Sequence, residues 1–106
     1  MSSEMKDNKN EILNLVYAAI DEVNEDLPNN AQLVKSKNTK LFGEFAVLDS
    51  LQLVNFIVEV ESLINDRFDI DITIADEKAF SQKTSPFLSV ESLFEYICHI
   101  LEESNI

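Results

Sequence analysis

Residues 49–61 read DSLQLVNFIVEVE, and here a short polar loop runs into the most apolar stretch of the chain. On a helix, these apolar side chains would cover more than one stripe. Such a helix lies at the centre of a bundle, or it keeps one face free for a partner. The stretch therefore predicts a helix that begins at Asp49 or Ser50 and ends at about Arg67.

Helical patterns lie on both sides of this stretch. Before it, apolar residues recur at three- and four-residue steps, which predicts a helix from about Asn10 to Asp26 that is ended by Pro28. After it, Ser89 is a suitable N-cap for a last amphipathic helix that ends near Glu103. The chain thus has a long helix on each side of the central one.

The connectors between these helices are long. Residues 31–48 show no sustained period, and we expect the apolar side chains of Leu41–Phe45 to pin this loop onto the core. Phe68–Ile72 alternates like a strand, but no second convincing strand could pair with it, so we expect an extended connector with its apolar side chains inward. A short helix is predicted over Ala75–Ser81, within an enlarged connector that covers 76–88.

Together these elements predict an all-α fold. Helices that are joined by connectors and bury apolar stripes on one another form a bundle. We expect a small four-helix bundle of three longer helices and one short helix, which occupies residues 10–106 as a single domain. Residues 1–9 are expected to be a disordered tail.

Length and charge narrow the class of protein. A chain of 106 residues with 45% hydrophobic content is large enough for one modest core. Eight basic residues against twenty acidic ones give a net charge of −12. A phosphate backbone needs clustered Lys and Arg, so nucleic acid is not expected as a partner. Strong acidity instead steers a small protein to partners with basic faces.

Cysteine usage and hydropathy point to a cytoplasmic protein. Cys98 is the only cysteine, so the chain cannot form an internal disulfide and has no zinc-ligand spacing. The polar N-terminal residues lack the apolar core of a signal peptide, and no segment is long enough to span a bilayer. We expect Cys98 to be a buried or half-buried hydrophobe. The acidic residues of 59–77 lack the spacing and the glycine of a calcium loop, so no metal site is expected.

Ser50 is the residue with the most functional interest. At a helix start, the first backbone N–H groups have no partners and carry partial positive charge, so a phosphodiester on this serine would lie in a favourable field. A serine nucleophile would need a base, but His99 is the only histidine and no Gly-x-Ser-x-Gly turn is present. We therefore expect a non-catalytic protein, in which Ser50 is modified by another enzyme.

Three segments in this order and spacing resemble the acyl carrier protein family. They are Leu48–Val54 with its Asp-Ser-Leu triplet, Phe68–Ile72 after a long helix, and Ser89–Ile97 at the start of the last helix. The similarity covers roughly Leu41 to Leu101. The triplet alone is a weak signal, and its position relative to the other two segments makes the resemblance specific.

The resemblance implies a carrier function with a covalent cofactor. Members of this family are four-helix bundles whose second helix begins at a modified serine, which here would be Ser50. A phosphopantetheinyl transferase moves 4′-phosphopantetheine from coenzyme A onto that hydroxyl, and the thiol of the arm carries acyl or aminoacyl groups as thioesters. The arm raises the effective concentration of its cargo at successive active sites. The implied partners are acyl-loading and acyl-using enzymes with basic docking faces, and we expect a monomer.

This chain departs from the family pattern beside the serine. Members often carry acidic residues just after the triplet and again about one turn later, where this chain has Gln52 and Asn55. The helix is also about one turn longer than usual. We therefore expect a specialised carrier, for a specialised lipid or secondary-metabolite-type pathway. The residues that we expect to contact partners are Asp49, Leu51, Gln52, Val54, Asn55, Val58, Glu59 and Glu61.

Two plainer interpretations stay open. Ser50 could be an ordinary first-turn residue that is never modified. The chain would then be a non-covalent, acidic protein-interaction module, whose net charge and apolar second helix bind a basic partner. The carrier hypothesis requires the Ser50 hydroxyl for function, whereas the interaction-module hypothesis does not.

Overall fold

The computed structural model describes residues 2–43, 46–76 and 86–103, with the backbone alone over 2–8. Within these ranges the fold is all-helical and contains no named strand. Its helices are α1 (Ser2–Asn24), the 3-10 helix η1 (Asn29–Ala31), α2 (Ser50–Phe68) and α4 (Val90–Glu103). The predicted all-α class and its three longer helices are confirmed.

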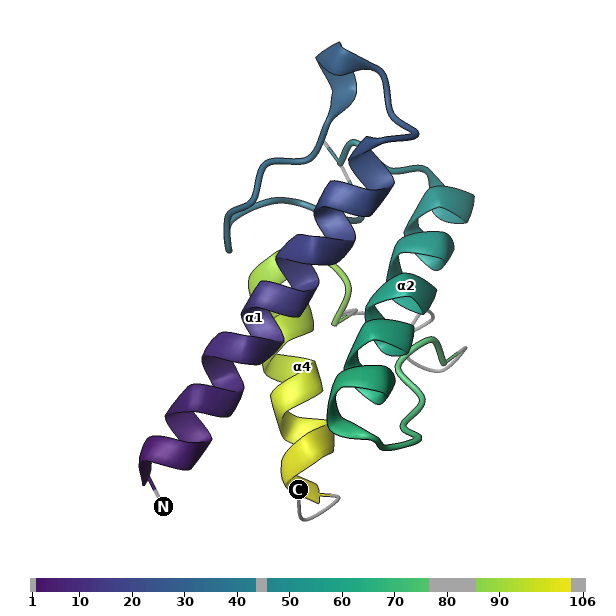
Figure 1. Cartoon of the computed structure of the whole chain (residues 1–106). Coiled ribbons are helices and arrows are strands. Elements are labelled where there is room, and N and C mark those ends of the chain that lie inside the picture. Colours follow the sequence, from purple (N-terminus) through teal and green to yellow (C-terminus); the bar gives the residue numbers. More distant parts are fainter. Residues whose placement is uncertain (1, 44–45, 77–85, 104–106) are drawn as a thin grey trace.

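The three long helices form a compact bundle with α1 against both of the others. Figure 1 shows that α2 begins at the end of the molecule where α1 stops, and that α2 and α4 then run in the direction opposite to α1. The connection from α1 to α2 therefore lies at one end of the bundle, and Ser50 lies at that end. The labelled N- and C-termini both lie toward the other end.

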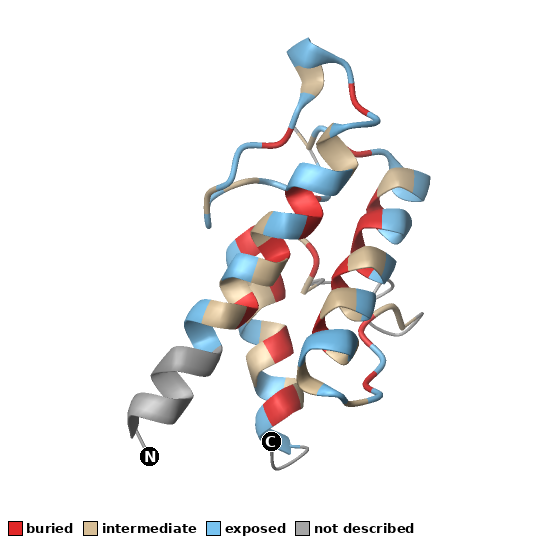
Figure 2. Ribbon diagram, viewed as in Figure 1, coloured by how far each residue is buried: buried red, intermediate tan, exposed pale blue. Residues whose placement is uncertain are grey.

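The core is one cluster to which all three helices and the connectors contribute. Figure 2 shows buried residues on the sides of the helices that face one another. The largest fully buried side chains include Phe56 and Ile57 of α2, Ile20 of α1 and Leu93 of α4. Phe87, which precedes α4, is also fully buried and meets the ring of Tyr96 edge-on, with 6.0 Å between ring centroids. Burial of this apolar surface is the main force that holds the bundle together.

The first helix differs from its predicted bounds. It begins at Ser2 and ends at Asn24, whereas the sequence pattern placed it from about Asn10 to Asp26. The helix therefore includes residues 2–9, which the pattern assigned to a tail because that segment has no apolar stripe. At the other end, three backbone bonds of the i→i−3 type over residues 25–27 tighten the chain into a turn before Pro28.

The loop between α1 and α2 is fixed to the core and to α4. Leu33, Leu41 and Leu48 are buried, as expected for apolar side chains that pin a long loop. Phe42 is an exception because 36% of its surface stays exposed, and Phe45 lies outside the described residues. Backbone bonds join this loop to the start of α4, including those from Val90 N to Thr39 O (3.0 Å) and from Leu41 N to Leu88 O (2.8 Å).

The segment after α2 is an extended connector from Ile70 on, as predicted, whereas Phe68 is still the last residue of the helix and Asp69 its cap. Asp69 ends the helix in the left-handed conformation (φ 53°), and the N–H of Ile70 returns to the carbonyl of Asn65. Ile72 and Ile74 then point into the core while Asp71 stays exposed. No strand pairs with this segment among the described residues, so its alternation reflects burial on one side.

Two further predictions concern α4 and the segment before it. The predicted cap is confirmed: Ser92 N donates to Ser89 Oγ (3.2 Å) and Ser89 N donates to Ser92 Oγ (3.0 Å). The short helix predicted over 75–81 lies almost entirely outside the described residues, because the description stops at 76 and resumes at 86. The structure therefore shows three long helices but does not test the fourth.

Candidate functional site

The start of α2 is capped by Asp49, and Ser50 takes no part in the cap. Asp49 Oδ1 accepts from Gln52 N (2.7 Å), and Gln52 Oε1 accepts in return from Asp49 N (2.9 Å). This reciprocal pair is a capping box, which satisfies two donors that a helix start would otherwise leave free. It also gives the uncharged Gln52 a structural role at the helix start.

Ser50 is the first residue of α2 and is exposed. Within the described part of the chain, its hydroxyl makes no hydrogen bond. Because Asp49 supplies the cap, the serine side chain is not needed to satisfy backbone donors. The hydroxyl thus lies at the positively polarised end of a 19-residue helix and is open to solvent.

Apolar residues on both sides of Ser50 fix the direction in which the chain enters α2. Leu48 precedes the cap and Leu53 follows in the first turn, and both are buried in the same core cluster. Residues in these two positions form a hydrophobic staple, which sets the angle of entry into a helix. The serine therefore lies on a segment that is held by a capping box and by two buried side chains.

The outer face of α2 carries exposed apolar residues. Leu51 is 70% exposed, Val54 38% and Val58 47%, and their spacing places them along one side of the helix. The predicted partner residue Asn55 is exposed on the same face. The structure thus brings four of the predicted partner residues together on a surface that begins beside Ser50.

Glu59 and Glu61 were predicted together as partner residues, but they lie on opposite sides of α2. Glu61 turns toward the connector after the helix, where its Oε2 accepts from Ile74 N (2.6 Å) and Ala75 N (3.0 Å). Glu61 therefore holds the connector in place. Glu59 lies on the side that faces α1.

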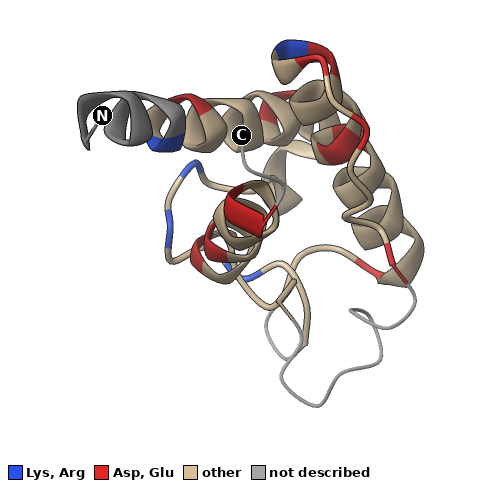
Figure 3. Ribbon diagram, turned by 90° about the horizontal axis from the view of Figure 1, so that it is seen from below, with Lys and Arg blue, Asp and Glu red and all other residues tan. Residues whose placement is uncertain are grey.

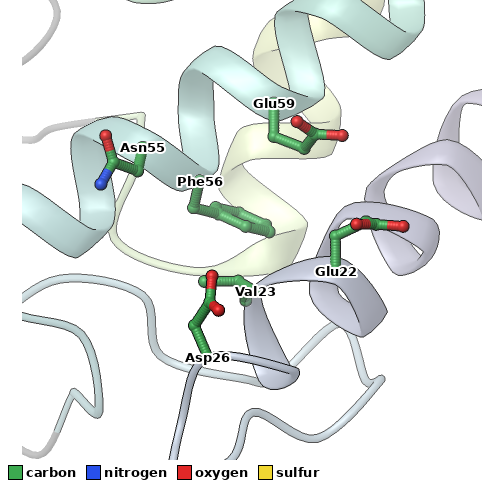
Figure 4. Close-up of a pocket in the computed structure, with 6 residues that line it drawn as sticks. All are labelled: Glu22, Val23, Asp26, Asn55, Phe56 and Glu59. Carbon is green, nitrogen blue, oxygen red and sulfur yellow. The ribbon is translucent and has the colours of Figure 1, made fainter.

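A pocket of about 270 Å³ opens between α1 and α2 next to Glu59. Figure 4 shows its lining: Glu22 and Val23 from α1, Asp26 from the turn that follows α1, and Asn55, Phe56 and Glu59 from α2. Three of these six side chains are carboxylates. The pattern of residues in α2 alone could not reveal this pocket, because half of its lining comes from the last turn of α1 and the turn that follows it.

The charges of the molecule are unevenly distributed. Figure 3 shows Asp and Glu on all three long helices, whereas three of the eight basic residues belong to the loop before α2. Of these, Lys35 pairs with Asp21 (3.2 Å) and Lys37 lies over the ring of Phe94 (5.3 Å to its centroid). Lys35 and Lys37 thus contact α1 and α4, and among the described residues no ion pair involves the exposed outer face of α2.

Cys98 and His99 are consecutive residues of α4. Cys98 is half-buried, and burial is the main cause that raises the pKa of its thiol. His99 pairs with Glu103 one turn later on α4 (3.0 Å). No group of three or more potential metal ligands occurs among the described residues.

Two asparagines have structural roles that the sequence pattern did not indicate. Asn24 donates to Leu33 O (2.9 Å) and accepts from Leu33 N (2.8 Å), which attaches the loop to the end of α1. Asn65 makes the same pair of bonds with Ile72, at 3.0 and 2.9 Å. Because each partner is several residues away, only the folded structure reveals these pairs.

Comparison with known proteins gives no match to a family model, to a curated protein or to a solved structure. Among the described residues, no helix is both long enough and apolar enough to cross a membrane. The function must therefore be argued from the residues and their geometry.

Proposed function

We propose that this protein is an acyl or aminoacyl carrier that holds its cargo as a thioester on a 4′-phosphopantetheine arm attached to Ser50. The observation that carries the proposal is the division of roles at the start of α2. Asp49 and Gln52 complete the cap between them, so the exposed hydroxyl of Ser50 is free for modification. Had Ser50 been the cap, its oxygen would already accept a backbone hydrogen bond.

The electrostatic setting supports a phosphodiester at this position. The first N–H groups of α2 favour a negative group within the first turn. The resemblance to acyl carrier proteins in residues 41–101 supports the same assignment. In the proposed architecture, a short helix before α4 would complete a four-helix bundle of the carrier type.

The proposed reaction leaves the chain as a substrate rather than a catalyst. The Ser50 oxygen forms a bond to the phosphorus of the phosphopantetheine moiety of coenzyme A. The bond from that phosphorus to the leaving 3′,5′-adenosine diphosphate breaks, and the hydroxyl proton is lost to solvent or to the transferase. A phosphopantetheinyl transferase would supply the catalytic groups. This chain would contribute the exposed hydroxyl, the capped helix end and the docking face.

The proposed cargo pathway is a specialised one. Gln52 belongs to the capping box and Asn55 lines the pocket. Both are uncharged, whereas acyl carrier proteins often have acidic residues at these positions. Acidity begins instead with Glu59. We propose partner enzymes that differ from those of ordinary fatty-acid synthesis, in a specialised lipid or secondary-metabolite-type pathway.

Intact-mass measurement after co-expression with a phosphopantetheinyl transferase tests the proposal. We expect the mass to rise by one phosphopantetheine group, and Ser50→Ala to abolish the increase without loss of the helical circular-dichroism signal. Ser62→Ala is the matched control, since Ser62 is an exposed serine of the same helix. The proposal fails if several unrelated transferases add no mass to the wild-type chain, or if the added group maps elsewhere.

The exposed apolar face of α2 favours a second candidate, a non-covalent interaction module. Leu51 and Val58 are exposed to solvent, whereas apolar residues of a helix usually face the core. Exposed apolar residues on one face are typical of a binding surface. On this hypothesis, binding to a basic partner would survive Ser50→Ala and would weaken as salt increases. Loss of every functional contact with Ser50→Ala would exclude it.

A further inference from the structure

The outer face of α2 has an apolar stripe that no described element covers. Leu51, Val54 and Val58 lie one to two helical turns apart, with exposed fractions from 38% to 70%. Val47, just before the helix, is also 39% exposed. A row of exposed apolar side chains on one helix face is typical of a surface that binds another protein.

The pocket between α1 and α2 adjoins this stripe. Asn55 and Glu59, which line it, directly follow Val54 and Val58 in the sequence, so the stripe and the pocket are neighbouring parts of one surface. Figure 4 shows Glu59 on α2 across the pocket from Glu22 on α1 and from Asp26 in the turn after α1, with Val23 and Phe56 between the two sides. The pocket thus combines an apolar wall with a negative rim.

The carboxylates of this rim are those of Glu22, Asp26 and Glu59. Within the described residues, the side chains of Glu22, Asp26 and Glu59 make no hydrogen bond or ion pair. Two other acids of α1 are paired: Asp21 with Lys35, and Glu11 with Arg67. Like charges around one pocket repel one another, and a cation bound between them would add attractive interactions that offset this repulsion.

We infer that the stripe and the pocket form one docking surface for a partner protein, which presents apolar side chains and, beside them, an arginine that enters the pocket between α1 and α2. Charge complementarity selects a basic group, and arginine fits better than lysine. Its planar guanidinium donates to several carboxylates at once, and it is hydrated weakly enough to lie against an apolar wall. The role of α1 in this surface goes beyond the proposed carrier function and does not depend on modification of Ser50.

A pair of synthetic peptides tests this inference on the full, unmodified chain. Both peptides are amphipathic helices with leucines along one face; one carries an arginine beside them and the other carries neutral citrulline at that position. Chemical-shift titration of the 15N-labelled protein measures both dissociation constants, and the side-chain amide of Asn55 reports on the pocket. We expect the arginine peptide to bind about fivefold more tightly at low salt, in keeping with a partly exposed ion pair.

Matched variants separate the pocket from net charge. Glu22→Gln with Asp26→Asn should reduce the preference for arginine to less than about twofold, because the partner charges are removed. Asp71→Asn with Glu102→Gln makes the same change in net charge at exposed positions outside the pocket, and it should leave the preference intact. Glu59→Gln removes a charge of the same pocket on the α2 side, and it should also reduce the preference for the arginine peptide.

Three results would overturn the inference: no binding of either peptide, equal binding of both, or equal loss of the preference in the pocket variant and its control. Each readout is obtained without a prosthetic group. If the peptides fail to bind as expected, the proposed modification of Ser50 is still decided by the mass measurement. If no mass is added, the docking surface is still decided by the peptide titration.

Discussion

Replacement of Asp49 by alanine should destabilise the protein, whereas replacement of the neighbouring Ser50 should not. Asp49→Ala removes the oxygen that accepts from Gln52 N at 2.7 Å, and it keeps the backbone N–H of residue 49 that donates to Gln52 Oε1. Ser50→Ala removes a hydroxyl that caps nothing and places a good helix former at the first helical position. The two changes, one residue apart, thus test which residue closes the helix.

The expected magnitude follows from the cap itself. Loss of an N-cap side chain costs about 1 kcal/mol, with an upper end near ~2 kcal/mol. Loss of a negative charge at the start of a helix adds a contribution of about 0.3 to 1 kcal/mol where the group is exposed. We therefore expect Asp49→Ala to lower the free energy of unfolding by about 1 to 2 kcal/mol, and Ser50→Ala to change it by less than ~0.5 kcal/mol.

Urea unfolding followed by circular dichroism at 222 nm measures both values. With a slope of about 1 to 1.5 kcal/mol per molar urea for a domain of this size, the midpoint should fall by about 1 M for Asp49→Ala. Asp49→Asn is the conservative control: it keeps an oxygen that can accept from Gln52 N and should recover most of the loss. Equal destabilisation by Asp49→Ala and Ser50→Ala would show that the serine oxygen is part of the cap, and the argument for a free hydroxyl would fail.

Two further outcomes test the structure away from the start of α2. Asn65→Ala should lower the free energy of unfolding by about 1 to 3 kcal/mol, because it leaves the N–H and C=O of the buried Ile72 without partners, whereas the exposed Asn14→Ala on α1 should be nearly neutral in the same urea titration. The thiol of Cys98 should react with iodoacetamide along a pH profile whose midpoint lies above that of the urea-unfolded chain. Burial raises the pKa of the Cys98 thiol, so less thiolate is present at a given pH in the folded protein; a folded midpoint at or below the unfolded one would contradict this.

The period of apolar residues predicted that the three long helices exist, and it located two of them closely. The apolar steps of α2 and α4 gave bounds close to those observed, and the Ser89 cap was recognisable from the spacing of Ser89 and Ser92. The start of α1 was missed. Its first residues continue a helix without an apolar stripe, and the period of hydrophobic residues was the only signal used there.

Functional geometry was predictable only where it is local. The position of Ser50 at a helix start follows from a few consecutive residues, and so does the capping potential of Asp49. The different roles of Glu59 and Glu61 were not predicted. Their spacing of two residues places them on different sides of the helix. Only the folded connector shows that Glu61 accepts hydrogen bonds from Ile74 N and Ala75 N. The pocket depends on α1, which lies about 30 residues earlier, and no local pattern relates the two segments.

The staple formed by Leu48 and Leu53 has a mechanical consequence for any group attached between them. Because the backbone on both sides of Ser50 is anchored in the core, the base of a flexible arm would stay nearly stationary relative to the bundle. The volume that the far end could sweep would then depend on the torsions of the arm alone. A partner enzyme that docks on α2 would encounter the cargo within a fixed radius, and small changes in docking angle would determine which active site lies within reach.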